Sequence, residues 1–200
     1  MNTAPKKQVA VSFLGTVLDS GFGQGRWQKW RPNVAMNQRQ DFHLDRMELF
    51  YAEKYRDLAD HVKADIQDVS PHTVVNLVPM ELENPWDFSE VYTKLHDWAA
   101  GYVFDTEEKT YLTHITTGTH VAQICLFLLV ESRQIPGVLL QTAPPKNQRR
   151  NMAAGDVGSY EIIDLDLARY DVLAERLAAV RDDAVRYLKS GISTQNAAFN

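Results

Sequence analysis

The chain has 200 residues, 44% of them hydrophobic and 24% charged, and a formal net charge of −5 at pH 7. This length and hydrophobic content suit one globular domain with a buried core. The acidic balance argues against a protein that coats nucleic acids nonspecifically, but it leaves room for a local basic pocket that takes a short nucleic acid.

The longest apolar run, Ile124–Val130, is far shorter than the ~20 residues that cross a bilayer, so we expect no membrane association. It contains the single cysteine, Cys125, which excludes a disulfide within the chain. We expect a buried, unreactive thiol and a cytoplasmic location.

In the first 80 residues, short apolar runs predict strands and a recurrence of apolar residues every three or four positions predicts a helix. Val9–Leu14 is a buried strand that Gly15 ends, and Ser70 and Pro71 end the helix. The predicted elements, in chain order, are a strand at 9–14, a glycine-rich loop at 16–32, a second strand at 33–38, a strand at 43–50, a helix at 52–69 and a strand at 73–78.

In the second half, a helix is predicted to begin near Asn84 and to end at Gly101. Asn84 is expected to be its N-cap and Pro85 to lie in its first turn, while Asp87 faces the positive end of the helix dipole. The remaining elements follow as a strand at 110–115, a helix at 119–133, a strand at 138–142, a polar loop at 143–159 with Lys146, Arg149 and Arg150, a strand at 160–165, a helix at 170–188 and a polar tail at 191–200.

Strands that alternate with helices predict an α/β, Rossmann-like domain, in which a mostly parallel central sheet carries helices on both faces. The segment 136–165 reads as a C-terminal β-hairpin, so the sheet is expected to be mixed. Ligands of such sheets bind at the carboxyl ends of the strands. Two loops are expected there, Gly15-Thr16 and Thr116–His120.

The turn Thr116–His120 is the strongest candidate site. It joins a predicted strand directly to a helix, whose first backbone N–H groups and positive dipole end suit an anion such as phosphate. Capping explains one threonine, but it leaves two more threonines, Gly118 and His120 unexplained. Gln123, one turn after Thr119, is expected to face the same site.

The segment Arg26–Arg31 interleaves cations with two tryptophans, a pattern that suits stacking on bases and binding of phosphates. Burial of the tryptophans in the core, with solvated cations, is an equally open interpretation. The glycines at 15, 21, 23 and 25 do not match a dinucleotide fingerprint, and no P-loop is present.

No metal set or catalytic group stands out, and no cofactor is expected. His114 and His120 lack acidic or cysteine partners at ligand spacing. Histidine is a common general acid or base, so acid–base action of His120 on a phosphodiester remains an alternative to hydrogen bonding.

Several blocks resemble the N-terminal domain of the RtcR family, regulators of a bacterial RNA-repair operon. The resemblance runs from about residue 8 to residue 200, and its most specific parts are ITTGTHVAQI and NPWDF. The blocks are VAVSFLGTVLD, RWQKWRP, ENPWDFSEVY, YLTHITTGTHVAQICLFLLVE, IIDLDLARY and LKSGI.

The resemblance implies a CARF (CRISPR-associated Rossmann) domain that forms a homodimer and binds an RNA-derived ligand, with RNA ends bearing a 2′,3′-cyclic phosphate as the implied class. It further implies a ligand-sensing domain at 1–190, a linker beginning at 191–200, and an AAA+ ATPase partner domain in a sigma-54-type activator. Together with the helix-terminus argument, the expected ligand-binding residues are Gly15, Thr16, Arg26, Lys29, Thr116, Thr117, Gly118, Thr119, His120 and Gln123.

Three functions therefore stay open from the sequence. The first is a non-enzymatic RNA sensor. The second is an RNA-processing or ring-nuclease-like enzyme that uses His120, and the third is a dimerisation module without a ligand.

Overall fold

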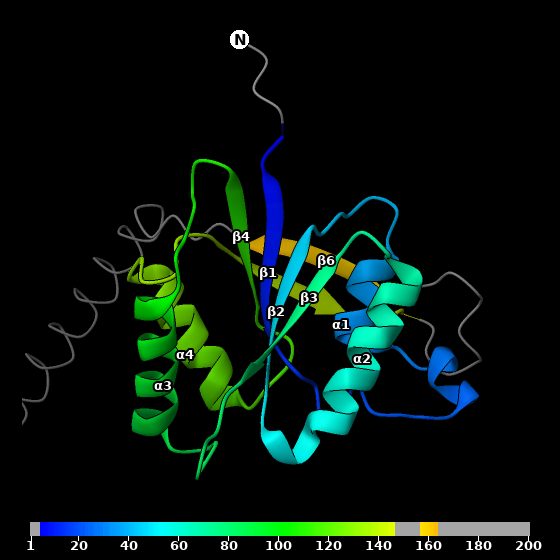
Figure 1. The fold of residues 1–200 in the computed structure, drawn as a ribbon, viewed down its shortest axis with the longest axis horizontal. Helices are drawn as coiled ribbons and strands as arrows, with labels where there is room; N and C mark the ends of the chain where they lie inside the picture. The colour runs from blue at the N-terminus through cyan, green and yellow to red at the C-terminus, as the bar shows by residue number, and fades with distance from the viewer. Residues whose placement is uncertain (1–4, 147–156, 164–200) are drawn as a thin grey trace, which may run out of the picture. The chain divides into compact units, whose positions relative to one another are not determined.

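A computed structural model describes residues 5–146 and 157–163 as a central β-sheet with helices on both faces (Figure 1). The strands are β1 Lys7–Phe13, β2 Arg46–Tyr51, β3 Val74–Pro79, β4 Lys109–His114, β5 Val138–Ala143 and β6 Ser159–Ile163. The α-helices are α1 Pro32–Ala35, α2 Arg56–Val69, α3 Phe88–Gly101 and α4 His120–Glu131, and short 3₁₀ turns occur at Gln24–Gln28, Met36–Gln38 and Glu53–Tyr55.

The sheet has the order β3-β2-β1-β4-β5-β6, with β6 antiparallel to β5 and the other neighbours parallel. The predicted Rossmann-like, mixed α/β fold is therefore confirmed. After β3 the chain crosses over and enters β4 on the other side of β1. Strand order thus reverses between β1 and β4, where α/β sheets form ligand crevices.

Two helical layers bury the sheet. On one face, Leu58, Val62 and Ile66 of α2 pack against a core that includes Met47 and Leu49 of β2. Figure 1 shows α1 and α2 on that side of the sheet and α3 and α4 on the other. Among the described residues, no helix is long and apolar enough to span a lipid bilayer.

The second predicted strand, at 33–38, is wrong. Pro32 occupies the first turn of α1, and the segment continues as a 3₁₀ turn at Met36–Gln38. Proline fixes φ near the helical value, and Asn33 turns its side chain into a buried polar cluster. The short apolar pattern of this segment was therefore compatible with either structure.

The start of α3 is also shifted from the prediction. Asp87, not Asn84, is the N-cap, and its carboxylate accepts a hydrogen bond from the Glu90 N–H at 2.8 Å. The Asn84 side chain instead accepts from the Trp86 N–H and stabilises the preceding turn. The predicted helix at 170–188, the tail at 191–200, and Arg149 and Arg150 lie outside the described residues.

A buried ion-pair cluster attaches the segment at 26–31 to α2. The Asp65 carboxylate accepts hydrogen bonds from Nε and Nη2 of Arg26. It also accepts one from Nη1 of Arg31, at 2.5 Å. Burial raises the pKa of Asp65, but the hydrogen bonds from the two arginines outweigh it and hold the pKa below its ordinary value. Arg31 and Asp65 are almost fully buried, so neither charge has water as an alternative partner.

We predict that Asp65→Asn lowers the free energy of unfolding by about 3 kcal/mol or more, because the Arg31 guanidinium is left buried without a counter-charge. Urea denaturation measures the effect. Asp60→Asn, on the exposed side of the same helix, is the control and should stay within about 0.5 kcal/mol of the parent. Equal stability of the two variants would contradict the structural role of the cluster.

Candidate ligand-binding site

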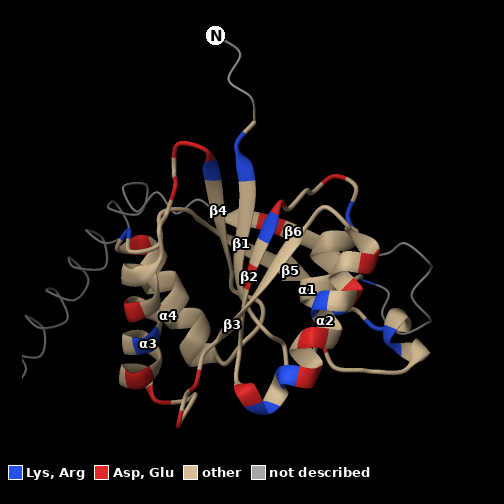
Figure 2. Ribbon diagram, in the orientation of Figure 1, with Lys and Arg blue, Asp and Glu red and all other residues tan. Residues whose placement is uncertain are grey.

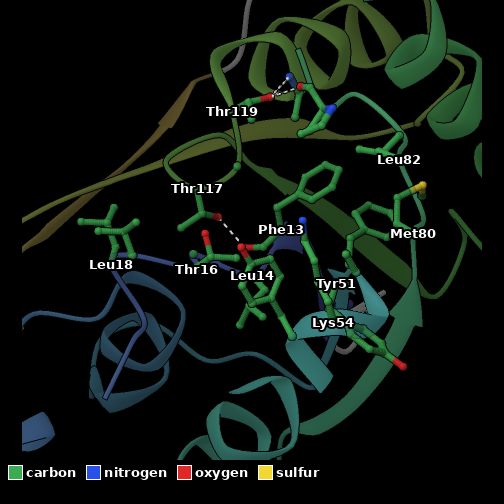
Figure 3. Close-up of a pocket in the computed structure, with 18 of the residues that line it drawn as sticks. Phe13, Leu14, Thr16, Leu18, Tyr51, Lys54, Met80, Leu82, Thr117 and Thr119 are labelled. Atoms are coloured by element: carbon green, nitrogen blue, oxygen red, sulfur yellow. Dashed lines mark hydrogen bonds between the residues drawn. The ribbon is translucent and has the colours of Figure 1, made fainter. Parts of the chain in front are cut away.

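A pocket with a volume of about 570 Å³ opens at the carboxyl ends of β1, β2, β3 and β4 (Figure 3). Each of these strands contributes the loop or turn that follows it. The lining residues are Phe13, Leu14, Gly15, Thr16, Val17, Leu18, Phe50, Tyr51, Ala52, Lys54, Tyr55, Met80, Glu81, Leu82, Pro85, Trp86, Thr116, Thr117, Gly118, Thr119, His120 and Ala122. The two loops expected at this edge of the sheet therefore do meet in one cavity.

The N-terminus of α4 forms part of the pocket wall. Thr119 is the N-cap, and its hydroxyl oxygen accepts a hydrogen bond from the Ala122 N–H at 3.1 Å. No described residue accepts a hydrogen bond from the backbone N–H of His120 or Val121. These two donors, together with the positive end of the α4 dipole, suit an anionic group.

The three threonine hydroxyls of the turn are engaged within the protein. Thr116 donates to the Thr142 carbonyl oxygen and accepts from the Thr142 N–H. Thr117 is buried and donates to the Phe13 carbonyl oxygen at 2.6 Å, as Figure 3 shows. Thr119 donates to the Pro85 carbonyl oxygen at 2.8 Å. The three hydroxyls therefore stabilise the shape of the pocket, and contacts with a ligand would come from other groups.

Two glycines allow the loops to approach each other closely. Gly118 has a φ of 87°, and a Cβ there would lie 3.3 Å from both Phe13 and Ala122. A Cβ on Gly15 would lie 2.7 Å from a carboxylate oxygen of Asp19. A side chain at either position would push the two loops apart.

A chain of buried hydrogen bonds runs beneath the pocket floor. The Ser12 hydroxyl donates to Asn33 Oδ1 at 2.6 Å and lies 2.8 Å from His114 Nδ1. His114 Nε2 lies 2.9 Å from the Thr142 hydroxyl. Since the Ser12 hydrogen is used by Asn33, Nδ1 of His114 donates to Ser12 and Nε2 accepts from Thr142. Burial lowers the pKa of His114 to about 3, so this imidazole is neutral.

Asp19 closes the first loop on itself. Its carboxylate accepts hydrogen bonds from the Gly15 N–H at 2.8 Å, from the Asn33 N–H at 3.1 Å and from Asn33 Nδ2 at 2.6 Å. Burial raises the pKa of Asp19 from 3.8 to about 6, against the opposing effect of these hydrogen bonds. The segment that presents Thr16, Val17 and Leu18 to the pocket is thus held at both ends.

Side chains that the sequence did not suggest complete the pocket. Lys54 is the ammonium group among the lining residues, and its Nζ lies 5.2 Å from the ring centroid of Tyr55. Figure 2 shows acidic and basic residues close together at the turn before α2, and Lys54 belongs to that turn. Trp86 follows β3 and is 62% exposed. The sequence did not single out Lys54, because the helical pattern places it in the solvent-exposed first turn of the predicted helix.

Three of the expected site residues are not among the pocket lining. The Arg26 guanidinium is bound to Asp65, and Lys29 is exposed on the loop that follows the 3₁₀ turn. Gln123 Nε2 lies 3.4 Å from the Gly118 carbonyl oxygen and so contacts the turn from outside. Thr16 lines the pocket and is exposed, and no described residue hydrogen-bonds to its hydroxyl.

The described residues contain no cluster of three or more His, Cys, Asp or Glu side chains that could hold a metal ion. His120 is exposed at the pocket rim beside Trp86, with ring centroids 6.5 Å apart. No described carboxylate pairs with it, so none of the described residues orients the imidazole as a catalytic triad does.

Comparison with solved structures agrees with the fold class. Residues covering 90% of this chain match 48% of Enterococcus italicus Csm6 bound to cyclic hexa-2′-fluoro-hexa-dAMP, with a TM-score of 0.60 and 15% identity. Can2 from Sulfobacillus thermosulfidooxidans, in complex with cyclic tetra-adenylate, matches 76% of this chain and 38% of its own at a TM-score of 0.46 and 11% identity. The Csm6 likeness and the sheet order together define a Rossmann-like α/β domain.

The family follows from sequence. The family model of RtcR, regulator of RNA terminal phosphate cyclase, matches residues 6–191. The transcriptional regulatory protein RtcR of Escherichia coli (strain K12) is 50% identical over 196 residues, which are 98% of this chain and 36% of that protein. The chain belongs to the RtcR family, and it spans about a third of the length of this relative.

We predict that Thr119→Val lowers the free energy of unfolding by about 1–2 kcal/mol, because α4 loses its N-cap and the turn loses its link to Pro85. Thr119→Ser keeps the hydroxyl and should stay close to the parent. Urea denaturation compares the two. A valine variant as stable as the serine variant would show that the cap has no energetic role.

The raised pKa of Asp19 makes the stability of the domain depend on pH. Between about pH 4 and 6 the folded chain holds a proton on Asp19 that the unfolded chain has released. This group therefore lowers the free energy of unfolding as the pH rises through that window, by up to ~3 kcal/mol. Its contribution is complete below the unfolded pKa and is lost above about pH 6.

The measurement is the difference in unfolding free energy between the parent and Asp19→Asn across pH 4 to 7. His114 is present in both proteins, so its own contribution cancels. The parent should lose stability relative to the variant as the pH rises. A difference that is constant with pH, or that rises with it, would contradict the raised pKa.

Proposed function

We propose that this chain is the ligand-sensing domain of a transcriptional regulator of RNA-repair genes, and that it binds the phosphate-bearing end of an RNA fragment. One observation carries the proposal. The pocket at the strand-order reversal combines the backbone N–H of His120, for which no described residue is an acceptor, with the Lys54 ammonium and exposed aromatic rings.

The chemistry of these groups favours RNA. A helix N-terminus and a lysine bind a phosphate, and aromatic rings stack on bases. The relative from Escherichia coli is a transcriptional regulatory protein, and the family is described as regulating RNA terminal phosphate cyclase. An RNA whose end carries a 2′,3′-cyclic phosphate is the ligand that this combination supports best.

The same reasoning extends to the longer protein. Our proposal places the sensor domain at 1–190 and a linker from 191, followed by an AAA+ ATPase domain that RNA binding releases from inhibition. It also includes a homodimer of sensor domains and a cytoplasmic location. Ligand binding can act this way only if one arrangement of sensor and ATPase binds RNA more tightly than the other.

We propose that the domain senses its ligand without cleaving it. Acid–base catalysis needs an imidazole held in position by a second group, and His120 has no such described partner. A labelled oligoribonucleotide with a cyclic phosphate end should be recovered intact after hours with the chain. Cleavage that disappears in His120→Ala would overturn this part of the proposal.

The direct test is a titration of the 200-residue chain with three oligoribonucleotides of one sequence, which end in a 2′,3′-cyclic phosphate, a 3′-phosphate or free hydroxyls. Fluorescence anisotropy should show the phosphorylated ends binding at least about tenfold more tightly than the hydroxyl end. Equal affinity for all three, or binding of none, would overturn the proposal.

We further predict that Lys54→Ala weakens binding of the cyclic-phosphate RNA by about tenfold and lowers the slope of log affinity against log salt concentration by about 0.7, as loss of one phosphate contact does. Lys29→Ala is the matched control, because Lys29 is exposed outside the pocket. Equal effects of the two substitutions would contradict phosphate binding by Lys54.

A further inference from the structure

The loop after β3 presents one large ring to the pocket. Trp86 lines the cavity, and 62% of its surface is exposed. No described residue accepts a hydrogen bond from its indole N–H, in contrast to Trp30, whose Nε1 donates to the Val157 carbonyl oxygen. An exposed indole does not contribute the stabilisation that burying its large apolar surface would give. Contact with a binding partner explains why the ring is exposed.

The backbone around Trp86 is held rigidly. The Glu90 carboxylate accepts hydrogen bonds from the Glu83 and Asn84 N–H groups, at 2.6 and 2.9 Å. Asn84 Oδ1 accepts from the Trp86 N–H at 3.1 Å. The exposed ring is therefore preorganised, and a ligand that stacks on it has little loop entropy to overcome.

A second link ties this loop to the helix that carries the phosphate-binding N–H groups. The Thr119 hydroxyl caps α4 and also donates to the Pro85 carbonyl oxygen, one residue before Trp86. The position of the indole is thereby set relative to the start of α4. A phosphate at that helix end and a planar group against the indole can be parts of one molecule.

The spacing between the rings of Trp86 and His120 suits a nucleic-acid base as the planar group. The centroids of Trp86 and His120 are 6.5 Å apart and their planes are inclined by 32°. Stacked bases are ~3.4 Å apart, so a separation of nearly twice that spacing leaves room for one base between the rings after a small rotation of His120. His120 is exposed and free to make that rotation.

We infer that Trp86 is a specificity residue of the pocket, which stacks on the base of the terminal nucleotide against His120 while α4 and Lys54 hold its phosphate. The inference rests on the proposed function and extends it, because it requires the ligand to be a nucleotide end and not merely an anion. An apolar peptide segment of a partner protein is the competing occupant of this ring.

The experiment compares two oligoribonucleotides that both end in a 2′,3′-cyclic phosphate, one with a normal terminal nucleotide and one whose terminal nucleotide lacks its base. Anisotropy titrations use the 200-residue chain, Trp86→Ala and Trp86→Phe. Phe88→Ala is the control, because Phe88 is an exposed ring two residues along that does not line the pocket.

The parent and Phe88→Ala should bind the base-bearing RNA about tenfold more tightly than the abasic RNA, as expected for one stacked base. Trp86→Ala should bind both RNAs equally, and Trp86→Phe should recover most of the preference. Retention of the preference by Trp86→Ala, or its absence in the parent, would overturn the stacking role and leave phosphate binding intact. Failure of both RNAs to bind the parent would overturn the proposed function as well, and would favour a protein partner for Trp86.

Discussion

The buried hydrogen-bond chain from Asn33 through Ser12 and His114 to Thr142 is the constraint on which the pocket depends. It joins the ends of β1, β4 and β5 and the start of α1, which are far apart in the sequence. Each group in it has a partner, and a neutral imidazole supplies one donor and one acceptor in line. A protonated His114 would carry a buried charge that no described carboxylate pairs with, and burial disfavours that charge. Burial therefore keeps His114 uncharged, with one donor and one acceptor in this chain.

Within the site, the groups that hold the loops in place differ from the groups that face the cavity. The polar side chains nearest the strand ends are used to hold the loops: Thr117 binds β1, Thr116 binds β5, and Asp19 closes the first loop. The groups exposed toward the cavity include backbone N–H at α4, the Thr16 hydroxyl, the Lys54 ammonium, and rings from the loops after β2 and β3. A site of this kind recognises its ligand with preorganised groups, since most of the ordering cost is met when the domain folds.

The sequence predicted the fold well because its strands and α2, α3 and α4 differ clearly in period and are separated by glycine, proline and capping residues. It failed at Asn33–Gln38, where buried polar contacts with residues 12 and 19 decide the conformation. For the pocket, it predicted that the turn before α4 lies at this edge of the sheet, but not the hydrogen bonds of its hydroxyls, because their acceptors lie elsewhere in the chain. Arg26 was expected to bind phosphate, yet its partner Asp65 is 39 residues away and no local pattern reveals the pair. Lys54 and Trp86 were missed because each sits at a position that local rules already explain.

Amide NMR tests most directly whether RNA phosphate binds at the start of α4. A uniformly ¹⁵N-labelled chain is titrated with an oligoribonucleotide that ends in a 2′,3′-cyclic phosphate. The amide resonances of His120 and Val121 should shift strongly and saturate at the affinity found for the RNA itself, because these N–H groups gain a charged acceptor. Saturable RNA binding that leaves both resonances unchanged would contradict phosphate binding at this helix end.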